Sequence, residues 1–368
     1  MRVLHLPVNT ASIASTTVRA LRTAGVEAHG IVFHASPIQS VAGLQAIPVG
    51  DRRHAAHILL SMARMAWALA QYVRQYGRPD VIHWYYSDAP ARLGLDRLVL
   101  KMLSAPGVVE WTGADIRIPD VEFAENPYYK RAWENGYEYR RVESRERSLI
   151  RQRRMGQLGL ASVAATGMLQ YVQRDLFPRV YQLEQRLILE EYEPVYPDQN
   201  RRAPRVLHIP SAPVAKGTSA VLKAVEALRS RCDFDFLLTA PGTPRSQVLV
   251  WMAEADIILD QFVLGDRGIL SLEAMALGKP VVCYLKPSLT SAYPPDLPII
   301  NATQDTLATV LEPVLRSGAL RSELGRRGRS FMEQHHDARR VIPELIEIYR
   351  EVQDRHIGLK AAFKTIAP

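Results

Sequence analysis

Short apolar runs alternate with longer amphipathic segments along the first half of the chain. Uninterrupted apolar runs of this kind are typical of strands buried in a parallel sheet. We predict strands at residues 2–8, 26–33 and 79–86, and further strands that begin at about 105 and 160. Between them, residues 14–25 and 51–77 place apolar side chains three and four positions apart, the spacing of a helix with one buried face. Asp51 and Gly77 are the expected N-cap and C-terminal stop of the longer helix.

The alternation stops at Leu183–Arg205, which is rich in Pro and charged residues and has no periodic pattern. We interpret this stretch as a linker between domains. The alternation then resumes with predicted strands at residues 205–210, 233–240, 256–263, 280–285 and 297–303. Three predicted helices complete the chain, at residues 304–318, 320–336 and 338–356.

Strand and helix alternating in two halves predict an α/β protein with two doubly wound, Rossmann-like domains. We expect the first domain at residues 1–195 and the second at 200–345, with a C-terminal helix of about 345–368 packing back on the first. Because open parallel sheets bind ligands at the carboxyl ends of their strands, the two domains are expected to face each other across a ligand-binding cleft.

Composition supports a folded soluble protein with more than one hydrophobic core. The chain has 368 residues, of which 47% are hydrophobic and 23% charged. It contains no apolar run of membrane-spanning length, and its N-terminus lacks the pattern of a signal peptide. The two cysteines, Cys232 and Cys283, form neither a metal-binding spacing nor a disulfide framework. We therefore predict a cytoplasmic protein.

The formal charge of +8 is concentrated, with many arginines in residues 140–155. Such a charge suits a nucleic acid, an anionic membrane surface or a phosphorylated small molecule. No helix-turn-helix, zinc-finger or aromatic RNA-binding pattern accompanies it, so no nucleic-acid partner is predicted. Two interpretations of residues 140–155 stay open. They form a solvated helix with internal ion pairs, or a surface that docks on an anionic acceptor or on the inner face of a membrane.

The stretch Gly265–Leu285 predicts a short helix over residues 268–278, followed by a buried strand. The first backbone N–H groups of a helix have no intrahelical partner and favour an anion. Gly268 at the helix mouth permits a close approach of a ligand to the backbone. Glu273 lies about one turn inside the helix, where its carboxylate suits a ribose diol; the alternative is an exposed residue with no ligand.

Two further positions carry candidate chemistry. Lys216 and Gly217 follow a predicted strand of the same domain, and the Lys suits a phosphate held by the helix at residue 268, although a surface Lys is the alternative. Asp115 lies in the loop after the strand that begins at about 105, where it binds sugar hydroxyls or caps a turn. We set aside Asp233–Asp235 and His335–Asp337 as metal sites, because their positions suit a strand start and a helix end. The chain has no dinucleotide-binding, P-loop or nucleophile-elbow motif.

The residues just described resemble a known family. The stretch "GILSLEAMALGKPVVCY" is similar to the donor-site segment of GT-B glycosyltransferases, especially the retaining group called glycosyltransferase family 4, and "HIPSAPVAKGTSAVLKAVEAL" resembles the Lys-Gly segment of its bacterial members. "PDVIHWYY", "EWTGADIR" and "AATGMLQYV" resemble strands of the first domain. This resemblance implies a nucleotide-diphosphate sugar as donor, no cofactor, no metal, and retention of anomeric configuration.

The resemblance also implies roles for single residues. Glu273 corresponds to the second Glu of the family's E-x7-E motif, which binds the ribose, and Lys216 neutralises the diphosphate. Gly268 and the amides of Ile269 and Leu270 line the sugar and phosphate. Asp115 and Thr112 are the expected catalytic residues, at the acceptor side, where a sugar, a lipid-linked molecule or another small acceptor enters.

Three positions depart from the family pattern. Gly265 replaces the first Glu of the motif, Ser211 stands near the place of an Arg, and Thr112 replaces a His. Arg267 is a candidate for supplying the lost cation, and Asp266 for replacing the lost carboxylate.

These departures leave several functions open. The first is a sugar transferase of bacterial polysaccharide or glycolipid synthesis. The second is a degenerate subunit that binds a sugar nucleotide or serves as a scaffold without turnover, and the third is a sugar-nucleotide epimerase. The sequence names neither the sugar nor the acceptor, and we place base selectivity around residues 240–247.

Overall fold

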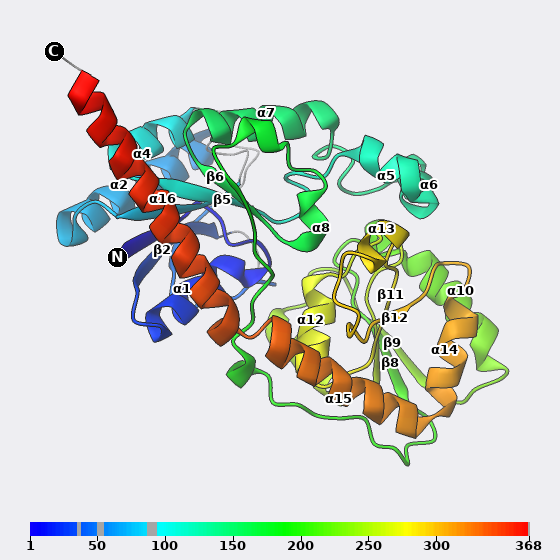
Figure 1. Cartoon of the computed structure of the whole chain (residues 1–368). Helices are drawn as coiled ribbons and strands as arrows, with labels where there is room; N and C mark the ends of the chain where they lie inside the picture. The colour runs from blue at the N-terminus through cyan, green and yellow to red at the C-terminus, as the bar shows by residue number, and fades with distance from the viewer. Residues whose placement is uncertain (35–37, 50–54, 87–93, 367–368) are drawn as a thin grey trace. The chain divides into compact units, whose positions relative to one another are not determined.

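The computed structural model describes residues 1–34, 38–49, 55–86 and 94–366 (Figure 1). Contacts divide the chain into two compact units. The first contains Met1–Arg117, Glu146–Arg186 and Ala338–Pro368. The second contains Ile118–Arg145 and Leu187–Asp337.

The first unit is built on a seven-stranded sheet in which every neighbouring pair is parallel. Its strands are β1 (Arg2–Leu6), β2 (Glu27–His34), β3 (Gln45–Pro48), β4 (Val81–Tyr85), β5 (Gly107–Trp111), β6 (Ala161–Ala164) and β7 (Val180–Gln182). Their order, β3-β2-β1-β4-β5-β6-β7, is the doubly wound order of a Rossmann-like domain. Strands β4, β5 and β6 are buried along their whole length, as expected of a parallel sheet covered on both faces.

Helices connect these strands. They are α1 (Ile13–Thr23), α2 (Ala55–Tyr76), α4 (Leu95–Leu103), α7 (Arg145–Gln157), α8 (Thr166–Leu169) and α16 (Ala338–Ile366), with single 3-10 turns at Thr10–Ser12 and Arg174–Leu176. Figure 1 shows α16 lying across the sheet beside α1, and α16 contacts β4 and β5. Within the described ranges, no helix combines the length and the apolarity that a bilayer span requires.

A buried polar network joins α16 to the strands of the first unit. Arg186 donates to both carboxylate oxygens of Glu110, at 2.9 and 2.7 Å. His83 Nε2 lies 2.9 Å from the same carboxylate, and His83 Nδ1 is 2.6 Å from the hydroxyl of Tyr349 on α16. Burial favours a neutral Glu110, but Arg186 and His83 outweigh it and hold the pKa of Glu110 at about 2. The buried charges of Glu110 and Arg186 are therefore paired.

The second unit has a five-stranded parallel sheet in the order β12-β11-β10-β8-β9. Its strands are β8 (Arg205–His208), β9 (Asp235–Leu238), β10 (Ile257–Leu259), β11 (Val281–Cys283) and β12 (Ile300–Asn301). Its helices are α5 (Pro119–Glu125), α6 (Pro127–Glu134), α9 (Pro213–Lys216), α10 (Thr218–Arg229), α11 (Arg245–Glu254), α12 (Ile269–Ala276), α13 (Pro287–Thr290), α14 (Leu307–Arg316) and α15 (Gly318–His335), with a 3-10 turn at Leu189–Glu191.

The short helix α12 packs into the core as its spacing predicted. Leu272, Met275 and Ala276 are at most 1% exposed and lie in one hydrophobic cluster with residues of β8, β10 and β11. Gly278, with φ of +73°, follows the helix, so the predicted stop is confirmed. This packing fixes the mouth of α12 beside the carboxyl end of β10.

The two doubly wound sheets confirm the predicted fold class. The division of the chain differs from the expected ranges at two places: residues 118–145 lie in the second unit, and the chain returns to the first unit at Ala338 instead of about 345. Helix α16 begins at Ala338, as does the helix predicted at residues 338–356. The residues at 118–145 follow the first sheet in sequence, but their side chains pack on the second unit through α5 and α6. Strands β3 and β7 and helix α4 were not predicted, and the expected N-cap Asp51 lies outside the described residues.

Candidate functional site

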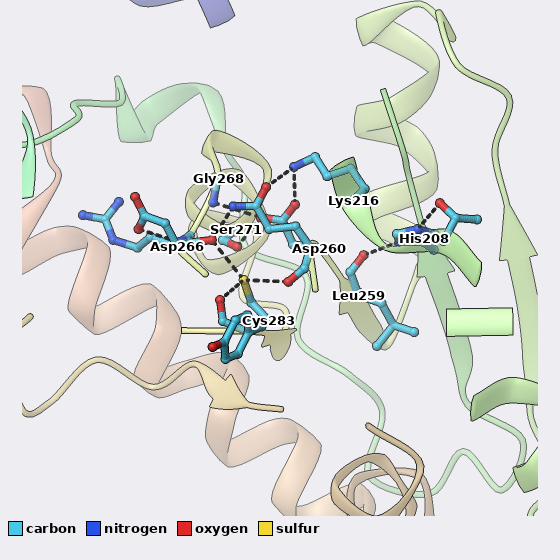
Figure 2. A network of polar contacts seen from close by, with 12 residues as sticks. His208, Lys216, Leu259, Asp260, Asp266, Gly268, Ser271 and Cys283 are labelled. Carbon is cyan, nitrogen blue, oxygen red and sulfur yellow. Dashed lines mark hydrogen bonds and ion pairs between the residues drawn. The ribbon is translucent and has the colours of Figure 1, made fainter. Parts of the chain in front are cut away.

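The carboxylate of Asp260, just past the end of β10, organises the mouth of α12 (Figure 2). Asp260 is fully buried, and its Oδ2 accepts hydrogen bonds from the backbone N–H of Gly268 at 3.0 Å and from the hydroxyl of Ser271 at 2.6 Å. Its Oδ1 accepts from the ammonium of Lys216 at 2.8 Å. The structure therefore brings Lys216 and Gly268 together, as the sequence predicted, through an acid that the sequence analysis missed.

The turn that carries Lys216 is fixed by the backbone conformation of Gly217 and by hydrogen bonds of His208. Gly217 ends α9 with φ of +75°, a left-handed conformation that favours Gly. His208, the last residue of β8, donates from Nδ1 to the carbonyl of Leu259 at 2.8 Å, and its Nε2 accepts from the Thr218 hydroxyl at 3.0 Å. These bonds tie the first turn of α10 to β10, and the Lys216 ammonium also donates to Gln261 Oε1 at 2.8 Å.

The electrostatics of this network follow from burial and from the Lys216 charge. Burial acts to raise the pKa of Asp260, but Lys216, Ser271 and the Gly268 amide outweigh it, so the pKa lies below its usual value. Burial lowers the pKa of His208 to about 4, which keeps the ring neutral at physiological pH. Burial also raises the pKa of the Cys283 thiol well above its usual range, so this Cys is a neutral core residue.

Gly268 is required by the closeness of its neighbours. A Cβ atom at this position would lie 2.9 Å from Asp260 Oδ2 and 3.3 Å from Lys216 Nζ. The φ of Gly268 is −92°, so any side chain is opposed by space and not by backbone strain. The close neighbours of Gly268 are thus Asp260 and Lys216, and the approach of a ligand to this backbone stays a prediction.

Gly265 lies where the resembling family has a carboxylate, and the structure shows what occupies that space. Its φ of +66° disfavours any side chain, and a Cβ atom would lie 3.0 Å from both Asn126 Nδ2 and Lys286 Cβ. The Lys286 ammonium is fully buried between the carboxylates of Glu122 and Glu125, at 2.7 and 2.6 Å. Asn126, between α5 and α6, and Lys286 therefore fill the region next to Gly265.

Asp266 and Arg267 lie against one aromatic residue. Asp266 Oδ1 accepts from the hydroxyl of Tyr293 at 2.6 Å and from the backbone N–H of Arg267 at 2.7 Å. The Arg267 guanidinium lies over the Tyr293 ring, 4.7 Å from its centre. Asp266 and Arg267, the candidates to replace the family's carboxylate and cation, are thus anchored within the loop that precedes α12.

Glu273 belongs to a separate group of polar residues. Its Oε1 accepts from the Tyr192 hydroxyl at 3.0 Å and forms an ion pair with Arg245, the first residue of α11. Arg245 also donates to the Tyr192 hydroxyl at 2.6 Å. Only 5% of Glu273 is exposed, so it is not the solvated residue of the alternative interpretation. Arg245 lies in the 240–247 stretch to which we assigned base selectivity.

The remaining donor-side candidates lie at two helix starts. Ile269 and Leu270 are the first residues of α12, where backbone N–H groups lack intrahelical partners. Ser211 is exposed in the loop before α9. The amides of Val214 and Ala215 at the start of α9 donate to the Glu138 carboxylate, at 2.7 and 2.9 Å.

Asp115 and Thr112 form a compact turn in the first unit. The Asp115 carboxylate accepts from the backbone N–H groups of Thr112 and Gly113 and from the Thr112 hydroxyl, at 2.7 to 3.2 Å. Arg151 of α7 donates to the backbone carbonyls of Ala114 and Asp115, at 3.3 and 2.9 Å. Burial raises the pKa of Asp115. Asp115 thus caps a turn, which is one of the two roles predicted for it. The other role, binding of acceptor hydroxyls, stays a prediction.

Asp260, Gln261 and Ser271 were not predicted from the sequence. One available signal was the acid-amide pair that interrupts the apolar run at residues 256–263, at the carboxyl end of a predicted strand. Among the described residues, no three His, Cys, Asp or Glu side chains are placed to hold a metal ion.

Solved structures with the same architecture identify the fold. No family model and no curated protein matches the sequence. Sucrose-phosphate synthase from Thermosynechococcus elongatus is similar over 96% of this chain and 99% of its own, with a TM-score of 0.63 and 13% identity. HepE from Anabaena, in complex with UDP-glucose, is similar over 95% of this chain and 100% of its own, with a TM-score of 0.57 and 13% identity.

The chain has the GT-B fold. WaaG, a glycosyltransferase involved in lipopolysaccharide biosynthesis, is similar over 95% of this chain and 99% of its own, with a TM-score of 0.52 and 14% identity. These similarities span nearly the whole chain, so the GT-B fold accounts for both units. It also agrees with the family that the Lys216 and Gly265–Leu285 segments resemble.

Proposed function

We propose that the chain is a glycosyltransferase that moves a sugar from a nucleotide-diphosphate sugar to an acceptor. The observation that carries this proposal is the junction of Lys216, Asp260 and the mouth of α12, within a chain of the GT-B fold. It places a cation and the start of a helix together, the two features that a diphosphate needs. The structure of HepE with UDP-glucose supports the same donor class.

The geometry suggests how each group contacts the donor. An ammonium has three N–H donors, and Asp260 and Gln261 accept from Lys216, so we assign the third donor to the diphosphate. The amides of Ile269 and Leu270 add backbone donors at the helix mouth. Both bonds that Glu273 forms with Tyr192 and Arg245 use Oε1, so we assign Oε2 to the ribose hydroxyls.

We assign the acceptor to the first unit, at the turn of Thr112 and Asp115. The acceptor class is a sugar, a lipid-linked molecule or another small molecule, in polysaccharide or glycolipid synthesis. We propose retention of configuration without a metal ion, in which Lys216 and the α12 amides stabilise the charge of the leaving diphosphate. We also propose an intracellular protein that associates peripherally with a membrane.

The second candidate function is binding of a sugar nucleotide without transfer. It is favoured by Gly265, because the motif's first carboxylate is absent and Asn126 and Lys286 occupy the adjoining space. Transfer, binding without turnover, and epimerisation are separated by incubating the protein with a panel of nucleotide sugars. Release of nucleoside diphosphate supports transfer, and an isomerised sugar supports the epimerase.

Lys216→Ala tests the donor site directly. A ligand that binds only the folded protein raises the melting temperature, so a panel of nucleoside diphosphates is screened first against the parent. Loss of a charge-assisted hydrogen bond should weaken the best ligand roughly 10- to 150-fold. Each shift is compared with the variant's own unliganded protein, since Lys216→Ala also removes the partner of Asp260.

The matched control is Lys223→Ala, on the exposed side of α10 in the same unit. It should keep the parent's affinity. An equal loss in both variants, or no stabilisation of the parent by any nucleoside diphosphate or nucleotide sugar, contradicts the assigned site.

A further inference from the structure

Helix α2 is apolar on the side that faces away from its domain. Met65 and Leu69 point into the core of the first unit, as expected for a helix that covers a sheet. On the opposite side, Leu59 and Trp67 are 61% and 62% exposed, and Leu60 is 48% exposed. Large apolar side chains gathered on one exposed helix face mark a binding surface more often than a solvated one.

Helix α4 also exposes large apolar side chains, and a cavity lies between the two helices. Leu98 and Met102, one turn apart on α4, are 62% and 46% exposed. With Met62 and Met65 of α2 they line an open cavity of about 110 Å³ whose walls are almost entirely apolar. A cavity of this size holds the end of a hydrocarbon chain, since an apolar cavity of roughly 150 Å³ binds benzene.

The floor of the cavity lies at the ligand-binding edge of the sheet. It is formed by Leu6 at the end of β1, by Phe33 near the end of β2, and by Trp84 near the end of β4. The carboxyl ends of parallel strands are where open α/β sheets bind ligands. The cavity therefore joins an exposed apolar surface to the edge of the domain that we assign to the acceptor.

Among the described residues of α2 and α4, the exposed charged side chains are all basic. Arg64 of α2 and Arg97 and Lys101 of α4 are exposed, and α2 contains no Asp or Glu. The one acid of α4, Asp96, is buried and forms an ion pair with Arg154. A second copy of this surface would bring like charges together, whereas anionic headgroups would neutralise them.

We infer that α2 and α4 dock the first unit on an anionic lipid bilayer, with Trp67 and its apolar neighbours in the headgroup region. The cavity between the helices takes the end of one lipid chain. Amphipathic surface helices bind membranes in this way, through apolar burial and attraction to anionic lipids. The inference deepens the proposed function by naming the surface that meets a lipid-linked acceptor, and it is measured without any transfer assay.

This assignment moves the membrane surface away from residues 140–155, where the charge is densest. Arg151 is 3% exposed and donates to the carbonyls of Ala114 and Asp115. Arg154 pairs with Asp96. Part of the charge of α7 therefore stabilises the fold of the first unit.

The test is flotation of the full chain with phosphatidylcholine vesicles that contain phosphatidylglycerol, at low and high salt. The parent should bind these vesicles at low salt and leave them at high salt, because the basic residues are exposed. Arg64→Glu with Lys101→Glu, and separately Trp67→Ser with Leu98→Ser, should each reduce the partition coefficient by at least about tenfold.

Two controls carry matched changes elsewhere. Arg153→Glu alters an exposed Arg of α7, and Leu222→Ser alters an exposed Leu of α10. The partition coefficients of both controls should stay within about twofold of the parent's. Because all variants change exposed side chains, their melting temperatures should match the parent's. No binding by the parent, an equal loss in Arg153→Glu, or a dimer that Trp67→Ser dissociates would each overturn the inference. If the parent protein binds vesicles but shows no transferase activity, the result counts against the proposed function alone.

Discussion

Asp260 is a buried carboxylate with three hydrogen-bond donors around it. Lys216, Ser271 and the Gly268 amide converge on its two oxygens, and none of these bonds is longer than 3.0 Å. A buried charge is tolerated when it is paired and fully hydrogen-bonded. Asp260 therefore fixes the Lys216 ammonium beside the mouth of α12, and in the proposed donor site this would lower the cost of ordering Lys216 on binding.

Asp260→Asn tests this positioning role. The substitution keeps the shape of the side chain but leaves the Lys216 ammonium without its counter-charge, so we expect the free energy of unfolding to fall by about 3 kcal/mol. Urea unfolding followed by circular dichroism measures the change. Asp233→Asn, at an exposed acid of the same unit, should change stability by less than about 0.5 kcal/mol. Equal stability of the two variants contradicts the role of Asp260.

At the scale of elements, α5 and α6 form part of the second unit although they follow β5 in the sequence. The Lys286 ammonium, fully buried, bonds to Glu122 of α5, which lies 164 residues earlier in the chain. Asn126 donates to the carbonyl of Val263 at 2.8 Å, and Glu138 accepts from the first amides of α9. This segment therefore supports the loop that carries Gly265 and the turn that carries Lys216.

Glu122→Ala should loosen this segment. It removes one of the two carboxylates that neutralise buried Lys286, and breaking a buried pair costs about 3 to 5 kcal/mol, less here because Glu125 stays. We expect a loss of about 2 kcal/mol in urea unfolding and faster hydrogen exchange in α5 and α6. Glu134→Ala, at an exposed position of α6, is the control and should leave both readouts unchanged. Unchanged exchange in α5 of Glu122→Ala would show that the segment is held by other contacts.

The same elements show what the sequence predicts and what it leaves hidden. Both parallel sheets were predictable because strands such as β8 and β10 are short apolar runs between helices with one buried face. The closeness of Lys216 and Gly268 was predicted because each follows a strand of the same sheet. In the structure both residues donate to the Asp260 carboxylate. The pairing of Lys286 with Glu122 was not predictable, since no local pattern links residues so far apart. Glu273 likewise lies with Tyr192 and Arg245, whose positions depend on tertiary packing.

At the scale of the whole molecule, both units enclose neutral histidines. His5 and His83 are fully buried in the first unit, and burial lowers the pKa of both. His208 is buried in the second unit with a pKa of about 4. Each ring packs as the uncharged form, so protonation in the native state is opposed by the loss of hydration.

These histidines predict that acid destabilises both units before the carboxylates titrate. An unfolded His has a pKa near 6.5, so between pH 6.5 and pH 4 the unfolded state binds protons that the native state does not. Stability is therefore complete above about pH 6.5 and falls as the pH is lowered. For His208, the window from 6.5 to about 4 corresponds to roughly 3 kcal/mol. Glu110, with a pKa of about 2, extends the loss to lower pH.

His208→Gln isolates one of these contributions. The variant loses the hydrogen bonds to Leu259 and Thr218, so it should be less stable than the parent at pH 7.5. Its stability should then fall less steeply from pH 6.5 to pH 4, because one buried histidine no longer resists protonation. Urea unfolding at a series of pH values measures both effects. The same change at exposed His57 should leave the slope of the parent intact. If His208→Gln and the parent lost stability in parallel, the acid sensitivity of the second unit would have to come from its carboxylates, and the neutral state of His208 would not limit its stability.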